Sequence, residues 1–300
     1  MECIKNHFLQ GHGIEGRFGG LPDEFSHLES AQIVVLPVPF DQTTTYGQGA
    51  DKGPAALIEA SRNLELFDIE TQSEVFRRGI YTAPAIEASN SEEMLALTYE
   101  RTLHFLKMGK FVTTLGGEHA ISQAPIRAHA DHFGKISVLQ FDAHSDLAYA
   151  YEGNPLSHAS VMARVREIPG VERSVAVGIR SMSSEEAAVV EKENTLYAHE
   201  IHEDERWIEK MLGRLSDPVY ITFDLDVFDS SLMPSTGTPE PGGLFWHQAA
   251  KALRAVAKRK KIIGLDIVEL CPSKQLRAPD FLAAKLLYKT LSYLFDGVKK

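Results

Sequence analysis

The sequence has little of what marks membrane proteins, disulfide-rich secreted proteins or nucleic-acid-binding proteins. No run approaches the roughly eighteen consecutive apolar residues of a membrane span. The two cysteines, Cys3 and Cys271, lie near opposite ends and cannot build a disulfide framework. The formal net charge of −10 argues against a general phosphate-binding surface. We therefore expect neither a membrane nor a nucleic acid among the partners of this protein.

The chain also has no internal repeat, no low-complexity segment and no linker rich in Gly, Ser or Pro. Its first residues, MECIKNHFLQ, are charged where a secretory signal needs a continuous apolar stretch, which favours a cytoplasmic location. With 44% hydrophobic and 24% charged residues, the composition is that of an ordinary globular protein. Because α/β folds of this length often form one domain, we predict a single domain over residues 1–300.

Six almost continuously apolar segments predict parallel strands covered on both faces. These segments are 31–40, 110–116, 135–142, 173–179, 218–226 and 261–270. Between them lie three helix-like stretches: one starts at Pro54 and runs to residue 67, one spans 91–109 with Ser91 as its expected cap, and one spans 247–260. Strands alternating with helices predict a three-layer α/β/α fold around a mainly parallel sheet.

The segment FDAHSD (141–146) places Asp142, His144 and Asp146 at two-residue spacing directly after an apolar strand. Alternate residues of an extended strand share one face, so three metal-competent side chains would point the same way. Such a cluster is costly to bury unless something compensates its charge.

Three further polar segments follow other apolar strands: LGGEHA (115–120), FDLDVFD (223–229) and Glu269 in DIVEL (266–270). The carboxyl ends of strands line the ligand crevice of open α/β sheets, so we expect all four segments to meet there. The candidate metal ligands are His119, Asp142, His144, Asp146, Asp224 and Asp226. Two imidazoles and four carboxylates suit a pair of borderline-hard divalent ions such as Mn²⁺, whereas structural zinc more often brings cysteine.

Each motif has an ordinary alternative when it stands alone. Asp-x-His-x-Asp can be a solvated strand end, Asp-x-Asp is more often a loop than a ligand pair, and GGEH can be a turn with a helix cap. Their joint occurrence at predicted strand ends favours a metal site.

Together these segments resemble the signatures of the ureohydrolase family of arginases and agmatinases. The resemblance is carried by GGEHA (116–120), FDAHSD, SHAS (157–160) and FDLDVFDSSLMPSTGTPEPGG (223–243), and GQGADKGPAALIEAS (47–61) resembles the family's N-terminal segment. It covers nearly the whole chain and is closest to agmatinases and aminopropylagmatine ureohydrolases. One departure is Glu118, where many relatives carry Asp.

The resemblance implies an enzyme with two Mn²⁺ ions per subunit. In the family pattern, His119 and Asp146 would bind the first ion, His144 and Asp226 the second, and Asp142 and Asp224 would bridge both. The resemblance further implies that a hydroxide would attack the guanidinium carbon and that urea and an amine would be released. The implied catalytic residues are Asp146, which holds the hydroxide, His158, which shuttles protons, and Glu269, which pairs with the guanidinium. Family members usually form trimers or hexamers, so a homo-oligomer is expected.

The loop between Asp146 and His158 bears on the substrate. Arginases recognise the α-carboxylate and α-amino group of arginine partly through an Asn where this chain has Ala148, whose methyl group cannot donate to a carboxylate. The loop offers Tyr149 and Asn154 but no Arg or Lys. A carboxylate-lined site should also disfavour an anionic tail. We therefore expect a small cationic guanidino substrate: agmatine, cleaved to putrescine and urea, or N1-aminopropylagmatine, cleaved to spermidine and urea.

Several alternatives stay open at this point. Within the family, the substrate could instead be arginine, guanidinobutyrate or formiminoglutamate. A metal-dependent deacetylase would carry a tandem-histidine motif, and no His-His pair occurs. A non-catalytic metal-binding relative would have lost ligands, whereas every ligand position is filled here. Trp246 follows PGGLF closely enough to lie at the edge of the crevice, and Cys271 is expected to be a buried thiol. Packing or surface roles are expected for the remaining histidines and tryptophans: His104, His129, His132, His199, His202, His247, Trp207 and, by default, Trp246.

Overall fold

A computed structural model describes residues 16–295 of the chain. Within them, one sheet has the strand order β2-β1-β3-β8-β7-β4-β5-β6, and every neighbouring pair is parallel. The strands are β1 (Ile33–Val38), β2 (Ile80–Thr82), β3 (Phe111–Gly116), β4 (Ile136–Phe141), β5 (Val171–Ile179), β6 (Thr195–Tyr197), β7 (Val219–Asp224) and β8 (Ile262–Val268). The predicted α/β fold with a parallel sheet is confirmed.

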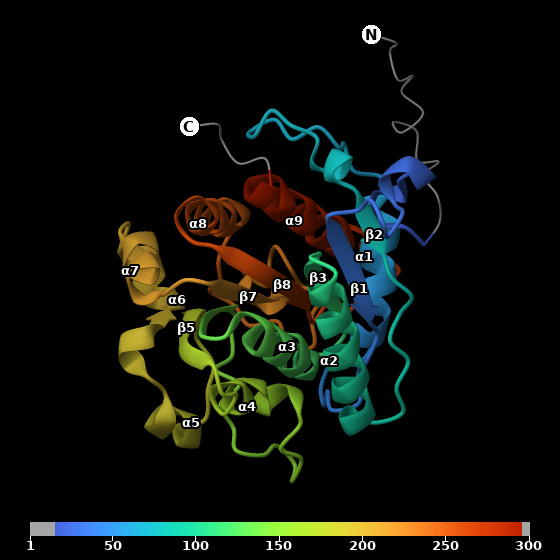
Figure 1. Ribbon diagram of the computed structural model, residues 1–300. Coiled ribbons are helices and arrows are strands. Elements are labelled where there is room, and N and C mark those ends of the chain that lie inside the picture. The colour runs from blue at the N-terminus through green and yellow to red at the C-terminus, as the bar shows by residue number, and fades with distance from the viewer. Residues whose placement is uncertain (1–15, 296–300) are drawn as a thin grey trace.

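Helices cover both faces of this sheet (Figure 1). They are α1 (Gly53–Ser61), α2 (Ser91–Lys107), α3 (Gln123–Phe133), α4 (Val161–Arg166), α5 (Ser184–Val189), α6 (Ala198–Glu203), α7 (Trp207–Arg214), α8 (Trp246–Arg259) and α9 (Ala278–Phe295). In Figure 1, α8 and α9 lie on one side of the sheet and α2, α3 and α4 on the other.

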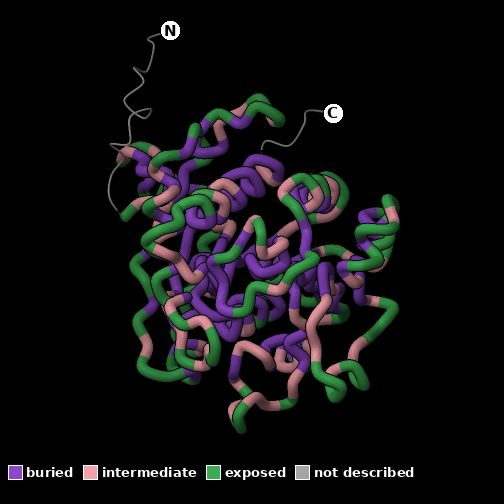
Figure 2. The backbone as a smooth tube through the Cα atoms, turned by 180° about the vertical axis from the view of Figure 1, so that it is seen from behind, coloured by how far each residue is buried: buried purple, intermediate pink, exposed green. Residues whose placement is uncertain are grey.

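The strands divide their side chains between two apolar layers because successive residues point to opposite faces. In β1, Ile33 and Val35 pack in the core shared with α1, α7, α8 and α9, whereas Val34 and Leu36 pack against α2. A third cluster joins α3 and α4 to β4 and β7. The sheet is therefore buried on both faces, as Figure 2 shows for the centre of the molecule.

Some local predictions differ from the structure. The edge strands β2 and β6 were not predicted, because three residues are too few to show a pattern. Helix α1 ends at Ser61, earlier than expected. Asn90, not Ser91, caps α2: its side-chain oxygen accepts a hydrogen bond from Glu93 N, and Ser91 is the first helical residue. Among the described residues, no helix combines the length and apolarity needed to cross a membrane.

The four central strands, β3, β8, β7 and β4, end at the same edge of the sheet. A close backbone approach brings the end of β1 to this edge as well. Gly117 N donates to Val38 and Glu118 N donates to Phe40, and a Cβ atom at position 117 would collide with the Phe40 carbonyl oxygen. The glycine therefore lets the segment after β3 lie directly against residues 40–45.

Candidate metal centre and active site

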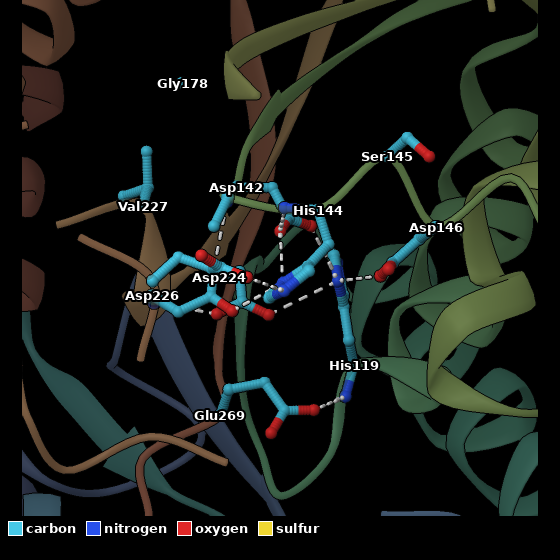
Figure 3. Close-up of polar contacts among 12 residues, drawn as sticks. His119, Asp142, His144, Ser145, Asp146, Gly178, Asp224, Asp226, Val227 and Glu269 are labelled. Carbon is cyan, nitrogen blue, oxygen red and sulfur yellow. Dashed lines mark hydrogen bonds and ion pairs between the residues drawn. The ribbon is translucent and has the colours of Figure 1, made fainter. Parts of the chain in front are cut away.

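The polar segments predicted to converge do meet at this edge. His119 begins a 3₁₀ turn after β3, Asp142 follows β4, Asp224 ends β7 and Glu269 follows β8. Figure 3 shows these side chains gathered in one place. They line or adjoin a cavity of about 170 Å³ that is also lined by His144, Asp146, His158 and Asp226.

Three carboxylates surround one nitrogen of His119. Its Nδ1 lies 2.9 Å from Asp146 Oδ2, 3.1 Å from Asp142 Oδ2 and 3.5 Å from Asp224 Oδ2. The ligand atoms of His119, Asp142 and Asp224 all lie within 4.8 Å of one another. One ion could therefore be held by this group.

A second group shares Asp142 with the first. His144 Nδ1 lies 2.8 Å from Asp226 Oδ2 and 3.8 Å from Asp142 Oδ1, and ligand atoms of these three residues also lie within 4.8 Å of one another. A carboxylate common to two groups is what a pair of neighbouring ions requires.

One oxygen of each of three carboxylates accepts a hydrogen bond from a backbone amide. Asp142 Oδ1 accepts from His144 N at 2.6 Å, Asp224 Oδ1 from Asp226 N at 2.8 Å, and Asp226 Oδ1 from Ala143 N at 3.0 Å. The two-residue spacing of the motifs thus orients Asp142 and Asp224, whereas Asp226 is oriented by the backbone of the neighbouring segment after β4. Partners of this kind orient metal ligands.

The ring of His119 is fixed from its other side. Thr222 Oγ1 donates to Asp266 Oδ1 at 2.7 Å and lies 2.9 Å from His119 Nε2. Because a hydroxyl has only one proton, Thr222 must accept from Nε2–H. Nδ1 is thereby the nitrogen that faces the three carboxylates. Although burial opposes it, hydrogen bonds to two of these carboxylates raise the pKa of the His119 imidazole well above its ordinary value, and the same nitrogen would bind a metal ion in place of the proton. Tyr220 holds the other oxygen of Asp266 at 2.9 Å.

The electrostatics of the cluster favour cations. Burial, reinforced by the neighbouring Asp146 and Asp226, raises the pKa of the Asp142 carboxyl to about 7. Although burial opposes it, the Asp226 carboxylate raises the pKa of the His144 imidazole to about 10. Four carboxylates outnumber two imidazoles even when both rings are charged. The donor set and its charge therefore fit a pair of divalent ions.

The three predicted catalytic residues lie at the same cavity. Asp146 and Glu269 have left-handed backbone conformations, with φ of 54° and 65°, which are uncommon for non-glycine residues. Glu269 Oε1 accepts a hydrogen bond from His119 N at 2.6 Å. Burial lowers the pKa of the His158 imidazole below its ordinary value, which favours a neutral ring.

Residues 43–46, just after β1, form a cavity wall that the sequence interpretation missed. Thr44, Thr45 and Tyr46 line the cavity, and Thr43 contacts His158. Glu118 accepts three hydrogen bonds from Gln42 and Thr43, which oppose the burial that raises the pKa of its carboxyl to about 7. The signal that could have revealed the wall was three threonines following a predicted parallel strand.

Other side chains differ from expectation. Tyr149 is 81% exposed, and Tyr151, not Tyr149, lines the cavity. Asn154 Oδ1 accepts from Leu156 N and so belongs to its own turn. Trp246 lines a separate apolar hollow beside Phe281 rather than the crevice. The thiol of Cys271 is half-buried, and burial raises its pKa, which disfavours the reactive thiolate.

The mouth of the cavity contains no counter-charge for an acid. Among the described residues, no Lys or Arg lines it, whereas Asp146, Asp224, Asp226 and Glu269 do. Ala148, the position identified in the sequence, does not itself line the cavity; its N donates to the carbonyl of Ala159, a lining residue, which places the backbone of Ala148 beside the cavity wall.

Metal-competent residues at the carboxyl ends of a central parallel sheet define the class: an α/β protein with a candidate binuclear metal centre. Residues 31–292 match the arginase family, and the chain belongs to this family, as its motifs indicated. An N(1)-aminopropylagmatine ureohydrolase of Thermus thermophilus is 38% identical over 269 residues, which are 88% of this chain and 90% of that protein. An agmatinase of Pyrococcus horikoshii is 32% identical over 87% of this chain and 91% of its own. The crystal structure of the agmatine ureohydrolase of Thermoplasma volcanium has a TM-score of 0.83 at 28% identity, covering 91% of this chain and 94% of its own.

Proposed function

We propose that this protein is an agmatinase-type ureohydrolase that uses two Mn²⁺ ions per subunit to hydrolyse agmatine to putrescine and urea. One observation carries the proposal. Two metal-competent groups, which have Asp142 in common, lie at the same cavity as the buried carboxylate of Glu269. Carboxylate-rich ligation favours manganese over zinc. The net charge of the chain and the cavity lining support a cationic substrate.

The residues of this chain have distinct roles in the proposed reaction. Bound metal ions supply a hydroxide at neutral pH. Glu269 pairs with the guanidinium and orients its carbon, and Thr44 Oγ1, which is buried without a hydrogen-bond partner in residues 16–295, offers a further acceptor. Asp146 and His158 pass a proton to the leaving nitrogen, so that the carbon–nitrogen bond breaks and putrescine departs as an amine.

N1-aminopropylagmatine is the second candidate substrate, giving spermidine and urea. It is favoured by the 38% identity to the Thermus thermophilus enzyme of that name. The rim of the cavity also suits a longer cationic tail. Tyr46 lines the cavity and is 82% exposed, so its ring is available for a cation–π contact with a substrate ammonium group. We further propose a cytoplasmic homo-oligomer that binds neither nucleic acid nor membranes.

The substrate assignment predicts the outcome of a urea-release assay. With Mn²⁺ present, kcat/KM for agmatine or N1-aminopropylagmatine should exceed that for arginine by at least about tenfold, or about 1.4 kcal/mol in the transition state. Guanidinobutyrate serves as the matched substrate whose tail ends in a carboxylate, and it should also be poor. Comparable rates with arginine would refute the argument from Ala148 and the cavity lining.

The metal assignment predicts the stoichiometry. Elemental analysis of the Mn²⁺-reconstituted protein should find two ions per chain. The Asp142→Asn variant should bind one ion per chain or fewer, because Asp142 belongs to both ligand groups. Asp131→Asn, the same change on the surface of α3, should keep two. One ion per fully active wild-type chain would sink the binuclear assignment.

A further inference from the structure

The hydroxyl of Thr43 contacts three polar groups. Thr43 Oγ1 is 3.0 Å from His158 N, 3.0 Å from His158 Nδ1 and 3.0 Å from Glu118 Oε1. It therefore touches both the backbone and the ring of His158 on one side and a fully buried carboxylate on the other.

The number of protons available to these groups restricts their arrangement. A hydroxyl donates one hydrogen bond and accepts two, and a carboxylate only accepts. While Glu118 is ionised, the hydroxyl of Thr43 donates to its Oε1, so the two lone pairs of Thr43 Oγ1 accept from His158 N–H and from the ring. The ring nitrogen that donates is Nδ1, and Nε2 then carries the lone pair.

Glu118 also fixes the position of Thr43. Its second oxygen, Oε2, accepts from Gln42 N at 3.0 Å and from Thr43 N at 2.6 Å, so one carboxylate holds both the backbone and the hydroxyl of Thr43. The approach of Gly117 to Phe40 brings the two segments into this contact.

We propose that Thr43, held by Glu118, is a positioning residue that keeps His158 in the Nδ1–H tautomer, so that Nε2 is the nitrogen that exchanges protons in the cavity. The inference rests on the proposed function in that it assigns proton transfer to His158. In both the neutral and the charged ring Nδ1–H remains a donor to Thr43, so only Nε2 changes protonation during a cycle. The ring need not turn between accepting and releasing a proton.

Neutron diffraction from crystals of the Mn²⁺-loaded, deuterium-exchanged protein tests the tautomer without reference to activity. At about pH 8, where an ordinary histidine is neutral, deuterium should be found on His158 Nδ1 and not on Nε2. In Glu118→Gln the amide oxygen must accept from the two backbone N–H groups, so the amide NH₂ takes the place of Oε1 and donates to Thr43. Thr43 must then donate to Nδ1, and the tautomer should invert to Nε2–H.

Deuterium on Nε2 alone in the wild type, or an unchanged tautomer in Glu118→Gln, would overturn the proposal. The position of deuterium on His158 can be measured even in a protein that cleaves no guanidino compound. A failure of this inference can therefore be distinguished from a failure of the proposed function.

Kinetics with agmatine test the consequence for turnover. Thr43→Val keeps the shape of the side chain but removes the hydroxyl, and should lower kcat by about 10–100-fold, the usual loss for such a supporting partner, with KM changed less than about threefold. Thr43→Ser restores the hydroxyl and should recover most of kcat. Thr102→Val, the same change at a buried hydroxyl of α2 without a partner in the described chain, should match the wild type. Wild-type kcat in Thr43→Val, or no recovery in Thr43→Ser, would contradict the proposed role.

Discussion

His158→Ala is expected to lower kcat by about 10²–10⁴-fold, the range typical of general acid–base groups, while two metal ions remain bound. The ring lines the cavity, with Nδ1 held by Thr43 and an edge-to-face contact with the Tyr151 ring at a centroid distance of 5.5 Å. It belongs to neither of the two metal-competent groups. Its loss should therefore remove proton transfer and leave the metal centre in place.

The measurement is kcat for urea release together with elemental analysis of the same preparation. His132→Ala, at an exposed position of α3, provides the matched control and should retain wild-type turnover. A His158→Ala protein that had lost its metal ions would instead place His158 among the ligands or their supports.

The central part of the site could be predicted because it follows from regular structure. Apolar runs predicted the strands, and parallel strands end at a common edge, so polar residues just after them had to converge. Asp142 and Asp224 illustrate this, since each immediately follows or ends a buried strand. The two-residue spacing predicted a common direction for Asp142, His144 and Asp146 from strand alternation, but β4 ends at Phe141 and Asp146 is left-handed, so these side chains converge through the conformation of the segment after the strand.

The hydrogen-bond partners that orient His119 and His158 could not be predicted, because they come from segments far away in the sequence and depend on tertiary packing. Thr222 and Asp266 sit inside β7 and β8, where a buried polar residue in an apolar run has no distinctive pattern. Thr43 meets His158 across 115 positions of sequence. Only the close approach of the backbones brings these groups together.

A common arrangement orients both histidines. His119 is held through Thr222 by Asp266, and His158 through Thr43 by Glu118. In each case the threonine hydroxyl donates its hydrogen bond to a buried carboxylate, so the threonine must accept a hydrogen bond from the imidazole. For His119 this exposes Nδ1 to the carboxylate cluster, and for His158 it leaves Nε2 free. The same chemistry thus serves metal binding in one ring and proton transfer in the other.

Glu269→Gln should lower kcat/KM for agmatine by roughly 30- to 5,000-fold, corresponding to the 2–5 kcal/mol lost when one partner of a buried charge pair is removed. Glu269 Oε1 accepts from His119 N at 2.6 Å, and only the amide oxygen of glutamine can replace it there. The NH₂ group must then occupy the position of Oε2, where it presents donors to the donors of the guanidinium. KM should therefore rise and kcat should fall, since both capture and orientation of the substrate suffer.

Glu172→Gln, an isosteric change at an exposed residue of β5, controls for the loss of one negative charge and should leave both constants unchanged. Metal analysis distinguishes the two contacts of Glu269. Retention of two ions is expected, because the glutamine oxygen still holds His119 N. Loss of metal from Glu269→Gln would mean that this carboxylate acts by fixing the His119 ligand, and its assignment to the guanidinium would be wrong.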